Sequence, residues 1–180
     1  QAKGPAGRTP RVFDLGGHVG IARHAFGRLV PLEDVDWLCQ DLPAVAARGA
    51  EIARERGTRG LRFTSDPNDG DGADVWMAAG SLQYLEWSLA DRLASLATPP
   101  EMVILNKTPA HPFLDGYTLQ NTGVAICPYR IFSGPALLAS LRSVGYECVE
   151  RWRDPVHSCR IPFHSEIDVP EYSGFVLRRR

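Results

Sequence analysis

"RVFDLGGHVG", residues 11–20, is the stretch that decides the fold of this 180-residue chain. Its apolar first half carries Asp14 near its end, and glycines follow at once. The next segment, residues 19–30, has apolar side chains at helical spacing. A short buried strand that passes through glycines into a helix is typical of parallel sheets whose ligands lie at the carboxyl ends of the strands. The sequence therefore predicts a ligand-binding turn, formed by Gly16, Gly17 and Gly20.

Strand-like and helix-like segments alternate along the rest of the chain. The predicted strands are 11–15, 35–42, 61–66, 74–81, 101–108, 146–152 and 172–179, and the predicted helices are 19–30, 44–57, 82–97 and 133–146. Pro43 is expected to stop the second strand, and Ser133 to cap the last helix. Residues 109–128 have no clear period and are predicted to form a functional loop. The alternation predicts an α/β protein with a doubly wound, mostly parallel sheet and helices on both faces.

The composition argues against a nucleic-acid-binding protein and against a membrane-spanning one. The formal net charge is −1, so nothing draws the chain as a whole to nucleic acid. No apolar run reaches the ~20 residues that a membrane helix needs. The four cysteines form no Cys-x-x-Cys pair, and we expect reduced thiols in a cytoplasmic protein. Residues 1–10 are predicted to be a flexible lead and 11–180 one domain. Because the chain begins at Gln1, we expect a preceding segment of a longer protein.

Two carboxylates accompany the glycine turn. Asp14, at the end of the first strand, can accept hydrogen bonds from a cationic or hydroxyl group of a ligand. Asp41 ends the second predicted strand and follows Gly20 by 21 residues. That is close to the ~20-residue spacing at which a carboxylate holds ribose hydroxyls in dinucleotide-binding folds. The combination favours nucleoside binding over the alternative of a glycine-rich turn without a ligand. No Gly-Lys-Ser/Thr follows, which excludes a Walker-type phosphate loop.

Several segments carry a resemblance to a known family. "VFDLGGHVG", "CQDLPAV", "DVWMAAGSLQYLEW", "GYECVERW" and "YSGFVLRR" resemble, in this order, the motifs of Rossmann-fold S-adenosylmethionine (SAM) methyltransferases. The resemblance implies a seven-stranded sheet with an antiparallel last strand. More narrowly, "ILNKTP", "PYRIFS" and "LLASLRSVGYE" are similar to bacterial methyltransferases often encoded near glycan and polysaccharide biosynthesis genes.

The resemblance implies SAM as cofactor and assigns residues to it. Asp14 and the amides of Gly16, Gly17 and Gly20 would hold the methionine portion of SAM. Asp41 would bind the ribose hydroxyls, Leu42 would pack on the adenine, and Asp66, with Ser65 as its neighbour, would reach the adenine amino group. Gly80 and Ser81 would line the pocket beneath the sulfonium. His18 stands where the family has its middle glycine. We expect its ring to turn outward; contact with the cofactor's carboxylate and weakened binding are the alternatives.

The resemblance implies methyl transfer to a small-molecule or glycan-linked acceptor. His111 is the first candidate for a general base, because imidazole titrates near neutral pH. Lys107 would orient an acidic acceptor, and Tyr129 lies nearby in the sequence. His157, Cys159 and His164 have no recognised metal-ligand spacing, so no metal is predicted. Two other functions stay open, a non-catalytic nucleoside-binding interaction module and an NAD-dependent oxidoreductase.

Overall fold

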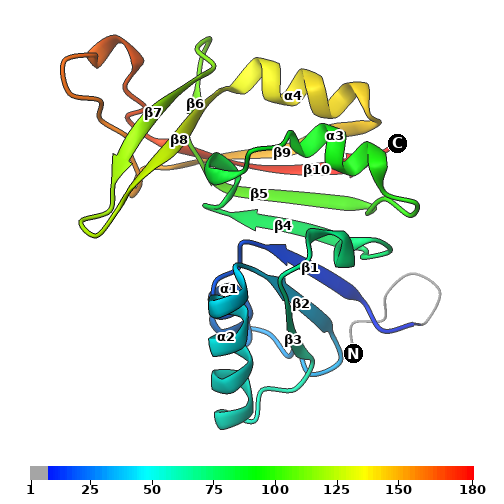
Figure 1. The fold of residues 1–180 in the computed structure, drawn as a ribbon. Helices are drawn as coiled ribbons and strands as arrows, with labels where there is room; N and C mark the ends of the chain where they lie inside the picture. The colour runs from blue at the N-terminus through cyan, green and yellow to red at the C-terminus, as the bar shows by residue number, and fades with distance from the viewer. Residues whose placement is uncertain (1–7) are drawn as a thin grey trace. The chain divides into compact units, whose positions relative to one another are not determined.

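The computed structural model describes residues 8–180 (Figure 1). Their contacts form two compact units. The first unit contains the chain up to residue 79 together with residues 96–103, and the second contains residues 80–95 and 104–180. Residues 1–7, the greater part of the predicted lead, lie outside the described residues.

The first unit holds the turn on which the sequence analysis rests. Its four strands are parallel and neighbour one another in the order β3-β2-β1-β4. Its elements are β1 (Arg11–Leu15), α1 (Ile21–Phe26), β2 (Asp36–Gln40), α2 (Pro43–Glu55), β3 (Leu61–Thr64), the 3-10 turn η2 (Pro67–Gly70) and β4 (Val75–Ala79). The chain places β2 on one side of β1 and β4 on the other, and ligands of doubly wound sheets bind where strand order reverses in this way.

The second unit combines the closing strands with a small separate sheet. Its elements are the 3-10 turn η3 (Leu82–Tyr84), α3 (Leu89–Ser95), most of β5 (Met102–Thr108), β6 (Ala110–His111), β7 (Gly116–Asn121), β8 (Ile126–Ser133), α4 (Gly134–Ser143), β9 (Tyr146–Asp154), the 3-10 turn η4 (Ser165–Ile167) and β10 (Tyr172–Arg179). β9 and β10 pair antiparallel, and β6, β8 and β7 form a three-stranded sheet. The whole seven-stranded sheet has the order β3-β2-β1-β4-β5-β10-β9. This order confirms the predicted α/β sheet, which is mostly parallel with an antiparallel end.

Three helix predictions need correction. The first helix ends at Phe26 rather than residue 30, because the chain closes into turns from Gly27 onward. The predicted helix 82–97 is split into η3 and α3, since Leu85 is extended and the Ser88 hydroxyl accepts the amide of Asp91 at 3.4 Å, which starts a new helix. Pro43 does not merely stop a strand; it is the first residue of α2, where its missing amide is not needed.

Residues 109–128, predicted to be a loop, instead contain β6, β7 and the start of β8. Residues Gly116–Asn121 of β7 pair antiparallel with Ile126–Ile131 of β8. Burial alternates along β7 between half-buried and exposed residues, which is the period of a strand with one face in solvent. The exposed face carries Tyr117 and Leu119, and these apolar residues obscure the alternation in the sequence.

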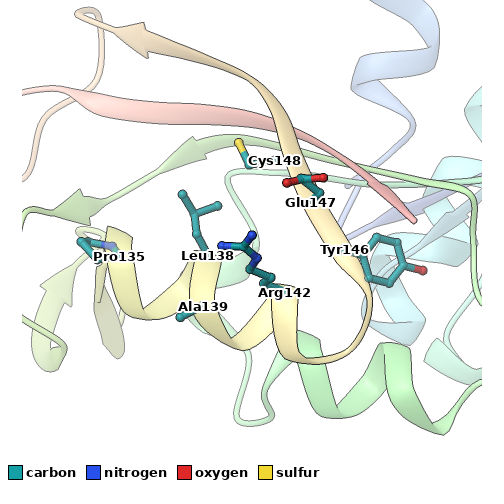
Figure 2. Close-up of a pocket in the computed structure, with 7 residues that line it drawn as sticks. All are labelled: Pro135, Leu138, Ala139, Arg142, Tyr146, Glu147 and Cys148. Carbon is teal, nitrogen blue, oxygen red and sulfur yellow. The ribbon is translucent and has the colours of Figure 1, made fainter. Parts of the chain in front are cut away.

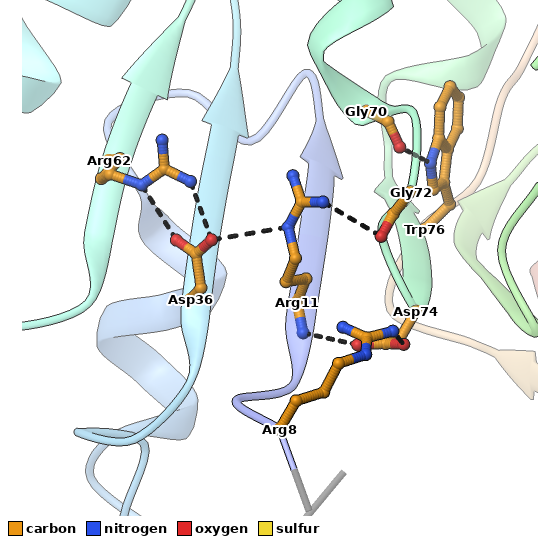
Figure 3. A network of polar contacts seen from close by, with 8 residues as sticks. All are labelled: Arg8, Arg11, Asp36, Arg62, Gly70, Gly72, Asp74 and Trp76. Carbon is orange, nitrogen blue, oxygen red and sulfur yellow. Dashed lines mark hydrogen bonds and ion pairs between the residues drawn. The ribbon is translucent and has the colours of Figure 1, made fainter. Parts of the chain in front are cut away.

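Buried aromatic rings and a polar network hold the first unit. Phe13 and Trp76 pack with ring centroids 4.7 Å apart, and the Trp76 indole donates to the Gly70 carbonyl at 2.9 Å. At the amino-terminal ends of the strands, Asp36 takes a bidentate pair from Arg62 at 2.8–2.9 Å (Figure 3). Asp74, just before β4, accepts the backbone amide of Arg11 at 2.8 Å. The strand ends opposite the glycine turn are thus tied together by charge.

Gly49 provides a test of the packing of α2 on β3. A Cβ at this position would lie 2.3 Å from a ring carbon of Phe63. We expect Gly49→Ala to lower the free energy of unfolding by about 1–3 kcal/mol, because this overpacking outweighs the ~1 kcal/mol that alanine contributes to a helix. Urea denaturation measures the change. Adding Phe63→Leu should recover part of the loss, and a Gly49→Ala protein more stable than the parent would contradict the close contact.

Candidate functional site

The turn between β1 and α1 is built by backbone that favours glycine. Gly16 and Gly20 have φ values of 67° and 81°. The amides of Gly16 and Gly17 both donate to the Gln40 carbonyl, at 2.8 and 3.2 Å, and the Gly20 amide donates to the Gly17 carbonyl at 3.0 Å. The three amides predicted to hold the methionine portion are therefore occupied inside the protein. In this structure the glycines contribute a tight conformation and not free donors.

Gly17 lies directly on the carboxyl group of Asp14. A Cβ on Gly17 would be 2.5 Å from the Asp14 carboxyl carbon and 2.7 Å from the Cys39 sulfur, so no side chain fits there. Asp14 is fully buried, and its Oδ2 accepts the Trp37 indole N–H at 3.2 Å. Its Oδ1 has no hydrogen-bond partner among the described residues. The carboxyl thus supports the turn from below, and a direct contact of Asp14 with a cofactor stays a prediction.

Burial changes the chemistry of Asp14. Removal from water raises the pKa of its carboxyl from 3.8 to about 7; the Trp37 hydrogen bond opposes this and the charge of Asp41 adds to it. The same surroundings raise the pKa of the Cys39 thiol, which donates to the His18 carbonyl at 3.3 Å and stays neutral. The buried groups under the turn therefore carry little charge at mildly acidic pH.

His18 takes the left-handed backbone that the missing glycine would take. Its φ is 55°, and its side chain is exposed, as expected for a ring turned outward. Its amide donates to Asp41 Oδ2 at 2.8 Å. The turn therefore accommodates the histidine, but its left-handed backbone conformation costs roughly 1–2 kcal/mol of free energy for a residue with a Cβ.

Asp41 connects the end of β2 to this turn. Besides the His18 amide, its carboxylate accepts the Leu42 amide on Oδ1 at 2.8 Å. A carboxylate has about four acceptor positions, so two remain for a ligand. Leu42 follows and is 71% exposed, which offers apolar surface at the same place. The structure brings together all of the predicted residues from Asp14 to Leu42.

Asp66 and Ser65 follow β3, the neighbour of β2. The Asp41 amide donates to the Thr64 carbonyl at 3.1 Å, which joins the two strand ends. Asp66 caps η2, since its Oδ1 accepts the backbone and side-chain amides of Asn68 at 2.8 and 2.7 Å. Ser65 and Asp66 are exposed. Asp66 is thus a turn-forming carboxylate here, and its contact with an adenine stays a prediction.

In the second unit, Gly80 and Lys107 both contact Asn106, and Ser81, which follows Gly80, is buried. The Gly80 amide donates to the Asn106 carbonyl at 2.9 Å, and Gly80 packs against the Lys107 side chain. The Asn106 side chain accepts the Lys107 amide at 3.0 Å and the Trp152 indole at 3.2 Å. Lys107 has a φ of 53°, a strained conformation of the kind found at functional sites. The Trp152 contact was not foreseen, because 46 residues separate it from Asn106.

His111 does not have the geometry of a general base. It is buried, and its Nδ1 accepts the amides of Phe113 and Leu114 at 3.3 and 3.0 Å. A neutral imidazole that accepts on Nδ1 carries its proton on Nε2, so neither nitrogen has a lone pair left for a substrate proton. His111 shapes the chain before β7 instead, and the prediction of a histidine base is not supported by this arrangement.

Tyr129 is part of a buried pair of tyrosines. Its hydroxyl lies 2.5 Å from that of Tyr172, and the ring of Tyr84 meets it edge-on with centroids 5.3 Å apart. Burial raises the pKa of both Tyr129 and Tyr172. Tyr129 is therefore a neutral hydrogen-bonding group. Tyr172 was missed by the sequence analysis, since no motif connects residues 43 positions apart.

Other features of the described residues lie apart from these groups. A cavity of about 340 Å³ between α4 and β9 holds no group assigned above (Figure 2); its lining residues are Pro135, Leu138, Ala139, Arg142, Tyr146, Glu147 and Cys148. All four cysteines are free thiols. Within residues 8–180, no three histidine, cysteine or acidic side chains are placed to share a metal ion. None of the helices in this part of the chain has the length and apolarity to cross a bilayer.

Asp14 generates a prediction about pH. Its folded pKa of about 7 exceeds its unfolded value of 3.8, so its contribution to stability is full below the lower value and is lost as pH rises through the higher one. Asp14→Asn cannot titrate. The stability of the parent relative to Asp14→Asn should fall between about pH 4 and pH 7, by at most ~1.4 kcal/mol per pH unit. Urea denaturation across this range measures it, and parallel pH profiles would contradict the raised pKa.

His18 generates a prediction about the turn. His18→Gly should raise the free energy of unfolding by roughly 0.5–1 kcal/mol, because the left-handed strain disappears while glycine's unfolded-state entropy cancels part of the gain. Thermal and urea unfolding check this. Phe163→Gly is a matched control, since Phe163 is also exposed and has a φ of 68°. A loss of stability in His18→Gly would mean that the imidazole makes a contact worth more than the strain.

Comparison with known proteins gives a uniform picture of the fold. No family model and no curated protein matches the chain. Among solved structures, a protein from Listeria monocytogenes assigned as a SAM-dependent methyltransferase is similar with a TM-score of 0.66 and 13% identity, covering 99% of this chain and 94% of that one. The 1,6-didemethyltoxoflavin-N1-methyltransferase of Burkholderia thailandensis, with bound S-adenosylhomocysteine, is similar with a TM-score of 0.60 and 20% identity, covering 96% of this chain and 72% of that one. The [4+2]-cyclase SpnF is similar with a TM-score of 0.63 and 14% identity, covering 96% of this chain and 76% of that one. The fold of this chain is therefore the one shared by SAM-dependent methyltransferases.

Proposed function

We propose that this chain is a SAM-dependent methyltransferase that acts on a small-molecule acceptor. The observation that carries the proposal is the glycine turn after β1, held by its His18 amide to the Asp41 carboxylate at the end of β2. This pair lies at the strand ends where doubly wound sheets bind nucleosides. The fold shared with SAM-dependent methyltransferases favours SAM over a nicotinamide cofactor, and the sequence resemblance adds glycan-linked acceptors to the candidates.

The residues present fit the nucleoside end of SAM. Asp41 keeps two acceptor positions beyond its bonds to the His18 and Leu42 amides, which suits the two hydroxyls of a ribose. Leu42 offers exposed apolar surface for the adenine ring. A carboxylate at this place repels a 2′-phosphate. The bound cofactor would supply a methyl group on a positively charged sulfur.

The chain's own contribution to methyl transfer is positioning. Tyr129 is neutral and His111 has no lone pair available, so neither takes a proton from the acceptor. Alignment of two reactants by itself supplies much of the rate of such a displacement. Lys107, held in a strained backbone conformation beside Gly80, is one cation that would orient an acidic acceptor. An acceptor that is already nucleophilic near neutral pH fits this set of residues best.

Calorimetric titration with S-adenosylhomocysteine tests the proposal. We expect saturable micromolar binding to the parent. Asp41→Ala should weaken it about 10–100-fold, the loss expected when hydrogen bonds to a charged group are removed, and Asp41→Asn should weaken it less. Asp34→Asn is the matched control, because Asp34 is exposed and precedes the opposite end of β2. It should bind as the parent does.

The other outcomes decide between the competing functions. Binding of NAD in place of S-adenosylhomocysteine would replace the proposal with an oxidoreductase. Binding without methyl transfer to any acceptor offered would favour a nucleoside-binding interaction module. His18→Gly should bind within about threefold of the parent; a much tighter complex would show that the imidazole obstructs the cofactor.

A further inference from the structure

A second cavity of the second unit has the features of a small-molecule site. It measures about 340 Å³, within the range of ligand pockets. It lies between β7 and the segment 158–162, which a backbone bridge from Cys159 to Val169 holds in place. Its deepest lining residues are Tyr129 and Tyr172, which belong to a buried apolar cluster. The floor of the cavity is therefore part of a packed apolar cluster.

The floor offers a hydrogen bond to a ligand. Tyr129 and Tyr172 are 2% and 7% exposed, and their hydroxyl oxygens are 2.5 Å apart. Two hydroxyls carry two protons, and the bond between them uses one. The other proton is left to donate to a ligand oxygen. Because burial raises the pKa of both tyrosines, the pair stays protonated near neutral pH and acts as a donor.

The wall beside the floor carries the side-chain amide of Gln120. Gln120 lines the cavity, and its Oε1 accepts the Tyr84 hydroxyl at 2.6 Å. With its oxygen engaged, the side chain can turn its N–H₂ end toward a ligand, and that end only donates hydrogen bonds. The floor and this wall thus both favour a ligand rich in acceptors.

The charge of the lining residues also favours a ligand rich in hydrogen-bond acceptors. Arg160 is the cation among the lining residues, and no aspartate or glutamate lines the cavity. Among the described residues, no carboxylate lies within ion-pair distance of Arg160. Leu119, Ile161 and Pro162 supply apolar surface in the same cavity. A small apolar body that carries an anionic group and a hydrogen-bonding oxygen matches these lining residues.

We propose that this cavity binds a small aromatic carboxylate, with the carboxylate on Arg160 and a ring hydroxyl or carbonyl on the Tyr129–Tyr172 pair. That this ligand is the methyl acceptor rests on the proposed function. The binding site itself does not, because its residues all belong to the second unit and none of them is assigned to the cofactor.

The test uses 6-hydroxy-2-naphthoate and its neutral carboxamide as probes, followed by NMR titration of the whole chain. The acid should bind about tenfold or more tightly than the amide, since only the acid forms a charge-assisted pair with Arg160. Arg160→Gln should remove this difference, whereas Arg178→Gln, an exposed arginine of β10, should preserve it. Tyr172→Phe should weaken both probes several-fold, because it removes one hydroxyl of the pair.

Several outcomes would overturn the proposal: equal binding of acid and amide, an unchanged preference in Arg160→Gln, or binding of neither probe. Arg160 is exposed, so its replacement leaves the fold intact, and unfolding curves check the Tyr172→Phe protein. The S-adenosylhomocysteine titration separates the two proposals. If the acid binds through Arg160 while S-adenosylhomocysteine does not bind, the proposed function fails and the aromatic-acid site stands.

Discussion

The hydrogen bond from the His18 amide to the Asp41 carboxylate is the interaction on which the candidate cofactor site depends. It joins the turn after β1 to the end of β2, and it leaves part of the same carboxylate open to solvent. In the same turn Gly17 lies against the buried Asp14 carboxyl, where a Cβ would be 2.5 Å from the carboxyl carbon. The Asp41 carboxylate that would bind the ligand and the buried Asp14 carboxyl that supports the turn thus lie at the same glycine turn.

The two units carry different kinds of chemistry. The first unit presents a carboxylate and an apolar side chain, Asp41 and Leu42, which are groups suited to a nucleoside. The second presents neutral donors and the cation Arg160, which are suited to an anion. Neither Tyr129, which is buried in a neutral pair, nor His111, which accepts two backbone amides, is placed to act as a strong base. A reaction run by these residues relies on binding and alignment.

Local patterns predicted the regular elements well and the small sheet poorly. β1, α2, β5, α4 and β10 appear close to where periodicity, caps and prolines placed them, because each of those signals acts within a few residues. The β7–β8 pair was taken for a loop, since exposed apolar side chains such as Leu119 break the visible alternation. The predicted helix 82–97 is split because Leu85 is extended and the Ser88 hydroxyl accepts the Asp91 amide at the start of α3.

The sequence by itself determined the mostly parallel sheet and the positions of Asp14, the glycines and Asp41, because strand period, glycine turns and fixed spacing are local properties of the chain. The antiparallel last strand was expected only from the resemblance to a known family. Only the tertiary structure decided what these groups do. Burial sets the pKa of Asp14, two backbone amides remove His111 from the candidates for a base, and the fold brings Tyr172 to Tyr129. Solvation and contacts between distant residues arise when the chain packs, and no short stretch of sequence encodes them.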